Sequence, residues 1–227
     1  MLRHLLTLAA AGLLAAPATA HFAFLVPTEP GKGKAVFSDS LKPDGAGVPV
    51  EKIAGTKLVV IADGKATDLT WTHDKTANCF TYDVPGTGSR LVVGTTDYGV
   101  FQRGDSKPAW LKYHPKAVFG DIPPADKATA GDRVPVELIP VLEAGNLRLR
   151  AVAGGKPLAK ADVTIIVPGE EKRKILTTDA GGMTEALDKP GQYGAYVLWV
   201  EEKSGEQGGK KYEAIRHYAT LVVTLTK

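Results

Sequence analysis

The chain has 227 residues, and its 28 Lys plus Arg against 25 Asp plus Glu give a formal net charge of +3. Because the lysines are scattered along the sequence, this charge provides no basis for nucleic-acid binding, which requires a clustered basic face. The single cysteine, Cys79, excludes an intramolecular disulfide, and we expect it to be a small buried apolar residue within a strand.

The first twenty residues have the pattern of an export signal. Arg3 gives a positive start, residues 5–16 are almost entirely apolar, and Ala18-Thr19-Ala20 is the small-x-small sequence that a signal peptidase accepts. The apolar run is shorter than the roughly 20 residues of a transmembrane helix, and no later run is longer. We therefore predict a cleaved signal peptide at 1–20, a periplasmic or secreted protein that begins at His21, and no transmembrane segment in the mature chain.

The mature chain has the pattern of an all-β protein. Short runs rich in Val, Ile, Leu, Thr and Tyr recur between turn signals, and no segment keeps a 3.6-residue period. These runs lie at 56–62, 69–72, 79–84, 90–95, 147–152, 162–167, 194–200 and 218–226. With 25 glycines and 15 prolines, the composition favours an antiparallel β-sandwich with many turns.

A boundary is indicated within residues 121–136, where Pro123-Pro124, residues 128–132 and Pro135 interrupt any regular element. We place the division near residue 130. It gives an N-terminal β-sandwich domain over 21–130 and a C-terminal one over 131–227, both of ordinary domain size.

The second predicted domain contains a pattern with a known counterpart. Gly-Lys-Pro-Leu-Ala-Lys-Ala-Asp-Val-Thr-Ile at 155–165 is followed by Thr-Thr-Asp-Ala-Gly-Gly at 177–182 and Lys-Pro-Gly-Gln-Tyr at 189–193. These segments resemble the transthyretin-like or carboxypeptidase-regulatory type of immunoglobulin-like sandwich. The resemblance implies two immunoglobulin-like antiparallel sandwiches in the mature chain, and it specifies a fold rather than an activity.

His21 is the most informative candidate site residue. As the first residue of the mature chain, it offers a free α-amine and an imidazole, with pKa values of about 8 and 6.5. These two nitrogens can chelate one metal ion, and a further histidine would complete the three-nitrogen site known as a histidine brace. The alternative is a frayed terminus. The apolar run at 22–26 favours a strand that holds the terminus in place.

His217 and His114 are the next candidates. His217 begins the last strand and shares its face with Leu221 and Val223, so it is either a satisfied histidine at the edge of the core or a ligand at the rim. His114 precedes Pro115, which favours an extended backbone, and it is a third candidate ligand. His73 is expected at a solvent-facing hairpin end.

Signatures of common catalytic sites are absent from the sequence. It contains no H-x-x-x-H, C-x-x-C or G-x-S-x-G motif, no P-loop and no dinucleotide fingerprint. No pair of carboxylates has a defensible spacing, and Met183 is the only methionine after residue 20, which argues against a Met-rich Cu(I) site. We therefore predict no enzymatic activity.

A wider resemblance covers most of the mature chain. It includes the leading histidine, Thr-Asp-Tyr-Gly-Val-Phe at 96–101, Lys-Tyr-His-Pro-Lys at 112–116 and Arg-His-Tyr-Ala-Thr-Leu at 216–221. The pattern resembles a secreted bacterial family described as periplasmic components of nickel or cobalt uptake systems. The resemblance implies a metal-handling protein with His21 and His217 as leading ligands and a membrane metal transporter as partner. The chain departs from amino-terminal metal traps in having Ala23 at the third mature position.

Three hypotheses follow. The preferred one is a periplasmic protein that binds a divalent transition metal through His21, His217 and His114, as an accessory to metal uptake or homeostasis. Copper or nickel suits such a nitrogen-rich set best, with cobalt or zinc as alternatives. The second is an interaction or adhesion module without metal, whose contact patch includes Tyr98 and Phe101 with Trp110. The third is a histidine-brace copper oxidoreductase, which requires an open coordination position and a substrate surface.

Overall fold

The computed structural model describes residues 21–45 and 48–226, and the predicted signal peptide at 1–20 lies outside them. The regular structure of the described part is β-strand apart from two short 3-10 helices, η1 (Val50–Ile53) and η2 (Gly131–Arg133). The predicted all-β sandwich class is therefore confirmed. Within the described residues, no helix is both long and apolar enough to cross a membrane.

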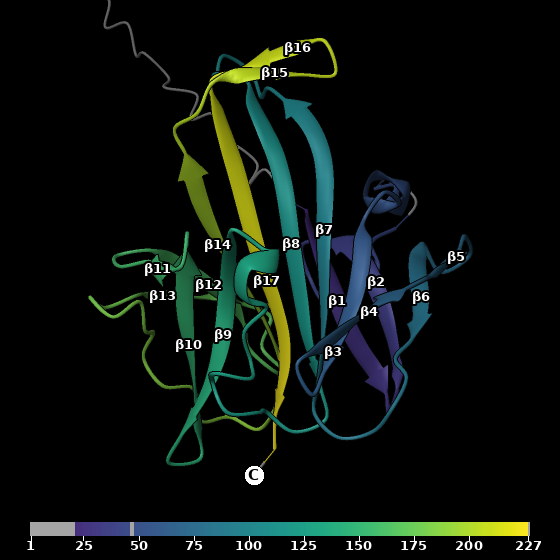
Figure 1. Ribbon diagram of the computed structural model, residues 1–227, viewed down its shortest axis with the longest axis vertical. Coiled ribbons are helices and arrows are strands. Elements are labelled where there is room, and N and C mark those ends of the chain that lie inside the picture. The colour runs from purple at the N-terminus through teal and green to yellow at the C-terminus, as the bar shows by residue number, and fades with distance from the viewer. Residues whose placement is uncertain (1–20, 46–47, 227) are drawn as a thin grey trace, which may run out of the picture.

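A large sheet of eight strands forms the middle layer of the molecule (Figure 1). Its strands in spatial order are β13 (Lys174–Thr177), β12 (Asp162–Ile166), β14 (Gly191–Glu201), β17 (Ala214–Leu225), β8 (Ala109–Phe119), β7 (Arg90–Phe101), β3 (Lys57–Ala62) and β4 (Lys65–Leu69). All neighbouring strands are antiparallel except the central pair, β17 and β8, which run parallel.

Smaller sheets cover the two faces of this layer. One face packs against a four-stranded sheet, in spatial order β1 (Phe22–Glu29), β2 (Lys32–Ser38), β6 (Cys79–Asp83) and β5 (Thr72–Asp74). The other face packs against a three-stranded sheet made of β11 (Lys156–Pro157), β10 (Asn146–Ala153) and β9 (Val136–Glu143). A separate hairpin, β15 (Gly205–Gln207) and β16 (Lys210–Tyr212), lies at the far end of β14 and β17 in Figure 1.

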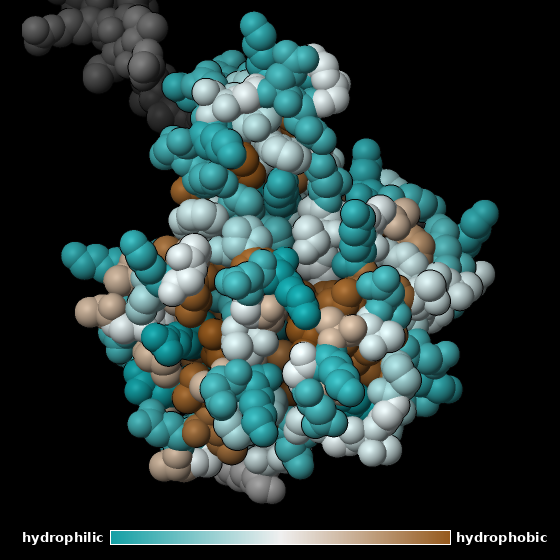
Figure 2. Space-filling view, viewed as in Figure 1, coloured by the Kyte–Doolittle hydropathy of each residue, from teal (hydrophilic) through white to brown (hydrophobic). Residues whose placement is uncertain are grey.

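Each face of the large sheet has its own hydrophobic core because side chains alternate along a strand. On β17, Val222 belongs to the core shared with β1 and β2, whereas Leu221 and Val223 belong to the core shared with β9 and β10. Figure 2 shows hydrophobic residues gathered where the layers pack and a mostly hydrophilic surface at the β15–β16 end. Cys79 on β6 is fully buried, as predicted.

The predicted division near residue 130 falls between β8 and β9. Strands from both sides of that point share the eight-stranded sheet, because β17 from the C-terminal half pairs with β8 from the N-terminal half. The segments at 155–165 and 177–182 form the β11–β12 region and a turn in which the Asp179 carbonyl accepts a hydrogen bond from the Gly182 amide. The division into two immunoglobulin-like domains stays a prediction.

Candidate functional site

His21 is held at the start of β1 by contacts on both its ring and its main chain. Its ring Nε2 lies 2.8 Å from Asp44 Oδ2, and its carbonyl accepts a hydrogen bond of 3.3 Å from the Tyr113 hydroxyl on β8. The ring also packs against Phe37 on β2, with centroids 5.8 Å apart. The expected strand is present, because β1 begins at Phe22, directly after His21.

Asp44 also determines which ring nitrogen of His21 is free. A carboxylate only accepts hydrogen bonds, so Nε2 is the protonated nitrogen and the neutral ring has its lone pair on Nδ1. Nδ1 is the ring nitrogen nearer the main chain in the covalent structure of histidine. A carboxylate that binds the far nitrogen is the usual partner of a metal-ligating histidine.

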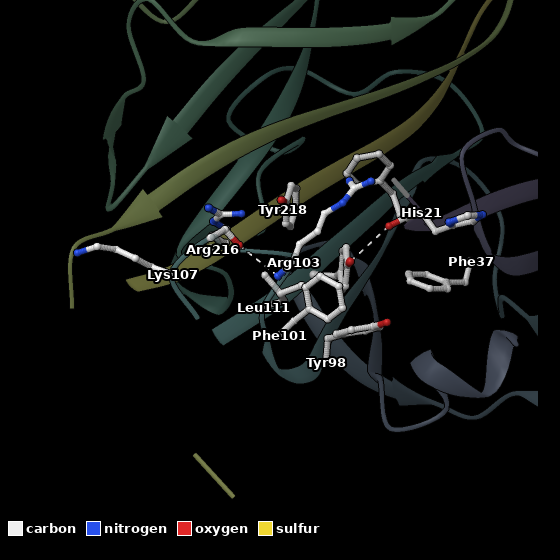
Figure 3. A pocket seen from close by; sticks show the side chains of 12 residues that line it. His21, Phe37, Tyr98, Phe101, Arg103, Lys107, Leu111, Arg216 and Tyr218 are labelled. Carbon is white, nitrogen blue, oxygen red and sulfur yellow. Dashed lines mark hydrogen bonds between the residues drawn. The ribbon is translucent and has the colours of Figure 1, made fainter. Parts of the chain in front are cut away.

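A cavity of about 400 Å³ opens beside His21 (Figure 3). Its walls come from β1, β2, β7, β8, β17 and the loop after β7, and they are mainly aromatic and cationic. The lining residues are His21, Phe22, Phe37, Tyr98, Phe101, Arg103, Ser106, Lys107, Leu111, Tyr113, Arg216 and Tyr218. Burial raises the pKa of the Tyr113 and Tyr98 phenols, so both remain protonated hydrogen-bond donors at neutral pH.

The parallel pairing of β8 and β17 decides which residues face this cavity. Arg216 lies opposite Leu111, and Tyr218 lies opposite Tyr113, so all four side chains share one face of the sheet. The next residue on that face of β17, Thr220, donates a 2.7 Å hydrogen bond from its hydroxyl to the carbonyl of Ala23 in β1. The face that carries His21 is thus the one with even-numbered residues of β17.

The other face of the same two strands carries a buried pair of histidines. His114 Nε2 lies 3.0 Å from His217 Nδ1, and His217 Nε2 lies 3.2 Å from Glu201 Oε2 on β14. Both histidine residues are only 3% exposed. Trp199, also on β14, stacks on the His217 ring with centroids 5.0 Å apart.

The Glu201 carboxylate at one end of this chain of hydrogen bonds determines which ring nitrogens carry the protons. Glu201 accepts, so His217 carries its proton on Nε2 and has a bare Nδ1. Burial lowers the pKa of His217 against the opposing effect of Glu201, and burial with the nearby His217 and Lys112 lowers the pKa of His114 to about 3. His114 is therefore neutral and donates from Nε2, which leaves its buried Nδ1 as an acceptor that has no partner in the described part of the chain.

A second buried polar group lies two residues further along this face of β8. Lys116 Nζ is 2.6 Å from Glu137 Oε2 on β9 and 3.0 Å from the carbonyl of Ala128. Glu137 also accepts from the Ala130 amide at 2.9 Å and from the Thr129 hydroxyl. Burial lowers the pKa of Lys116, and Glu137 opposes that shift.

The predicted three-histidine site is therefore wrong as a single constellation. The structure brings His114 and His217 together but places His21 on the opposite face of the eight-stranded sheet. Within the described residues, no group of three or more His, Cys, Asp or Glu side chains is arranged to hold a metal ion. The reason is the alternation of the strand: β1 covers the face of Tyr218 and Thr220, not that of His217.

The remaining candidates lie elsewhere. His73 is on β5, where its Nε2 is 3.7 Å from Glu51 Oε1. Of the three aromatics in the predicted contact patch, Tyr98 and Phe101 line the cavity. Trp110 belongs to the other set of β8 side chains, and its ring is covered by Lys112 Nζ at 3.7 Å from the centroid.

Sequence reasoning missed Asp44, Glu201 and the cationic lining of the cavity. Asp44 lies in a loop 23 residues after His21 in the sequence, and no spacing rule connects a loop carboxylate to a strand terminus. Arg216 offered a signal, because strand alternation places it on the face opposite His217. A comparison of the sequence with models of known protein families finds no match, and a comparison with curated proteins also finds none.

Proposed function

We propose that the chain is exported to the periplasm and there binds one divalent transition-metal ion through its mature N-terminal residue, His21, as an accessory to metal uptake or homeostasis. The observation that carries the proposal is the 2.8 Å contact between His21 Nε2 and Asp44 Oδ2. It orients the ring and leaves Nδ1 as the nitrogen with a lone pair, which is the ring nitrogen that can form a chelate with the α-amine of the same residue.

The donor set supports nitrogen-preferring ions. An α-amine and Nδ1 of the same histidine close a six-membered chelate ring, and imidazole suits copper, nickel and zinc. Copper(II) or nickel(II) therefore fits best, with cobalt(II) and zinc(II) as weaker alternatives. The amine and the Nδ1 nitrogen must both be free of protons to bind, so the affinity should rise with pH.

Two nitrogens from one residue fill only part of a coordination sphere. The described residues around His21 supply no second histidine, cysteine or ligating carboxylate. The nearby carboxylate of Asp44 already accepts a hydrogen bond from the His21 ring. The remaining positions are left to water or to a ligand that arrives with the metal. Partial coordination favours delivery to a membrane transporter over long-term storage. Among the described residues that line the cavity, His21 is the one histidine, whereas a copper brace needs two.

The test begins with protein produced with its own first twenty residues and purified from the periplasm. Intact mass identifies the first residue, and competition titrations with Cu(II) and Ni(II) give the stoichiometry and affinity. We expect a His21 start and one site. His21→Ala should lower the affinity about a hundredfold or more, and Asp44→Asn should lower it by about ten- to a hundredfold, as is usual for loss of the residue that orients a ligand.

One modified form and one matched variant make the assignment specific. Acetylation of the His21 α-amine keeps the ring but removes the amine donor, so the affinity should fall, although less than in His21→Ala, which loses the imidazole. His217→Gln changes only the opposite face and should bind as the wild type does. The proposal fails if processed wild-type protein takes up no metal, or if His217→Gln loses as much affinity as His21→Ala.

A further inference from the structure

The cavity beside His21 has a chemical character that metal binding does not explain. Three cationic side chains and a set of aromatic rings line it, and the carboxylate that contacts His21, that of Asp44, is not among the lining residues. Its volume of about 400 Å³ is that of a small-molecule pocket.

A β-bulge builds the aromatic wall. Along β7 and β8, Asp97 pairs with Lys112 and Gly99 pairs with Leu111, so Tyr98 is an extra residue without a partner. The insertion shifts the alternation of β7 by one residue. Phe101, which pairs with Ala109, consequently joins Tyr98 on the cavity face instead of the opposite face.

The bulge is held by specific contacts. Gly99 adopts a φ of +95°, and its amide donates to Asp97 Oδ1 at 3.0 Å. The same carboxylate accepts from the Trp110 ring at 2.5 Å and from the Gln207 side chain at 3.1 Å. Bulges of this kind often re-aim side chains beside functional sites.

The aromatic surfaces are partly open. Tyr98 packs against Phe37 and Tyr113 with centroids 5.7 and 5.6 Å apart, and Tyr113 stacks on Tyr218 at 5.5 Å. Phe101 is 46% exposed although it is a large apolar side chain. A flat apolar body placed in the cavity would cover these rings and remove that surface from water.

The cations are not fully neutralised by the protein. Lys107 pairs with Glu213 at 2.5 Å, but among the described residues neither Arg103 nor Arg216 has a carboxylate within ion-pair distance. Figure 3 shows Arg103 extending across the cavity toward His21. A guanidinium with free donors is the side chain best suited to hold a carboxylate through two parallel hydrogen bonds.

We infer that this cavity binds a small organic carboxylate with a flat, apolar body, its carboxylate on Arg103 and Arg216 and its body against Tyr98 and Phe101. Inorganic anions use only the arginines, and neutral aromatics use only the rings, so both should bind less tightly than a ligand with the two parts joined. The inference does not require a metal at His21, and it concerns a different part of the same pocket.

The test uses benzoate as the probe, titrated into processed protein in the presence of EDTA and followed by calorimetry and NMR chemical shifts. Saturable binding of benzoate is expected, with acetate and benzyl alcohol each at least about tenfold weaker, because each lacks one half of the recognition. The shifted signals should come from residues that line the cavity.

Variants separate charge from apolar contact. Arg103→Gln and Arg216→Gln should each weaken benzoate binding about tenfold, the usual effect of losing one charge-assisted hydrogen bond, and Phe101→Ala should weaken it by a smaller factor. Arg103 is an exposed loop residue, so its variant tests the inference without risk to the fold. The matched control is Arg148→Gln. Arg148 lies on β10 and pairs with Glu143 and Asp179, and its variant should bind benzoate as the wild type does.

Three outcomes would overturn the inference. The first is no benzoate binding up to about 10 mM, a concentration well beyond the dissociation constant of even a weak site. The second is that benzyl alcohol binds as tightly as benzoate. The third is that both arginine variants bind benzoate with wild-type affinity. Because all titrations are free of metal, a failure of metal binding at His21 would leave a positive benzoate result unchanged. Likewise, a failure of benzoate binding would leave a positive result for metal binding at His21 unchanged.

Discussion

The two faces of β8 and β17 carry opposite kinds of polar chemistry on neighbouring residues of the same strands. The face toward β1 has an open cavity, with an oriented His21 and with arginines that have no carboxylate partner among residues 21–45 and 48–226. The face toward β9 has polar groups that are buried and mostly paired with each other, such as His217 with Glu201 and Lys116 with Glu137. Exposure decides the difference: a buried charge needs a partner, whereas a charge at a cavity wall remains available to a ligand.

The comparison predicts a division between the two faces, one of which affects stability and the other binding. Substitutions on the buried face should change stability and leave binding unaffected, and substitutions in the cavity should change binding with little effect on stability. Variants of the buried ion pair, of the buried histidines, of the bulge and of an isolated hydroxyl test this division, in descending order of expected effect.

Lys116→Met should produce the largest loss of stability. It leaves Glu137 as a buried carboxylate without its ammonium partner, and loss of one member of a buried pair typically lowers the free energy of unfolding by about 3–5 kcal/mol. Urea denaturation at pH 7 measures the change. Replacing both residues, as Lys116→Met with Glu137→Leu, should recover part of the loss, because no charge is then left unpaired.

The matched control for this variant is Lys189→Met. Lys189 and Glu170 form a pair of 3.2 Å between side chains that are 45% and 49% exposed. An exposed pair of this kind contributes at most about 1 kcal/mol. Equal losses in Lys116→Met and Lys189→Met, or a loss of benzoate binding in Lys116→Met, would contradict the division between the two faces.

The sequence predicted the strands of both faces better than the contacts between layers. Alternation correctly placed His217 with Leu221 and Val223 at the edge of one core, and the proline after His114 correctly indicated extended backbone. Alternation says nothing about which other sheet covers each face, so the expected contact between His21 and His217 was wrong. Asp44 depends on a long-range contact that has no local sequence signal. The bulge at Tyr98 rests partly on the local contact between Asp97 and Gly99, which the alternation pattern did not reveal.

The buried histidines should make stability depend on pH. The pKa of His114 is about 3 in the folded protein and about 6.5 in the unfolded chain, so the unfolded chain binds the proton first as the pH falls. As far as His114 is concerned, the free energy of unfolding is therefore highest above about pH 6.5 and falls progressively as the pH decreases toward 3. Between pH 6.5 and pH 4.5 the free energy of unfolding should fall by about 2–3 kcal/mol on account of His114.

His114→Gln isolates this contribution. Glutamine can still donate to His217 Nδ1 but does not titrate, so the slope of unfolding free energy against pH should become shallower over the same interval. His73→Gln, on the partly exposed β5, provides the comparison with a histidine that lies outside the buried pair. A His114→Gln profile parallel to that of the wild type would show that the histidine is not held neutral by burial.

Gly99→Ala tests the bulge that places Tyr98 and Phe101 on the cavity face of β7. An alanine at a φ of +95° is strained although a Cβ there would meet no atom within 4 Å, so a loss of about 1–2 kcal/mol is expected from the backbone alone. Benzoate binding should weaken as well, since Phe101 and Tyr98 depend on the bulge for their direction. Gly55→Ala, also without a contact within 4 Å and without a positive φ, should change neither quantity.

The smallest effect is expected from a hydroxyl in the four-stranded sheet. The Tyr82 hydroxyl and His114 Nδ1 are the two buried side-chain polar atoms in the described residues without a hydrogen-bond partner, one on each side of the large sheet. The Tyr82 ring packs tightly over Gly33, where an added Cβ would lie 2.4 Å from the ring. Burial raises the pKa of this phenol, so the hydroxyl stays protonated.

Tyr82→Phe removes that hydroxyl and keeps the ring. Because a buried polar atom without a partner costs free energy, the variant should be as stable as the wild type or more stable, by less than about 1 kcal/mol. Tyr193→Phe provides the contrast, since the Tyr193 hydroxyl donates to the Lys189 carbonyl at 2.7 Å and its loss should cost about 1 kcal/mol. If thermal denaturation showed Tyr82→Phe to be the less stable of the two, the hydroxyl would have a partner, such as a bound water, and the β1 side would contain a buried polar network of its own.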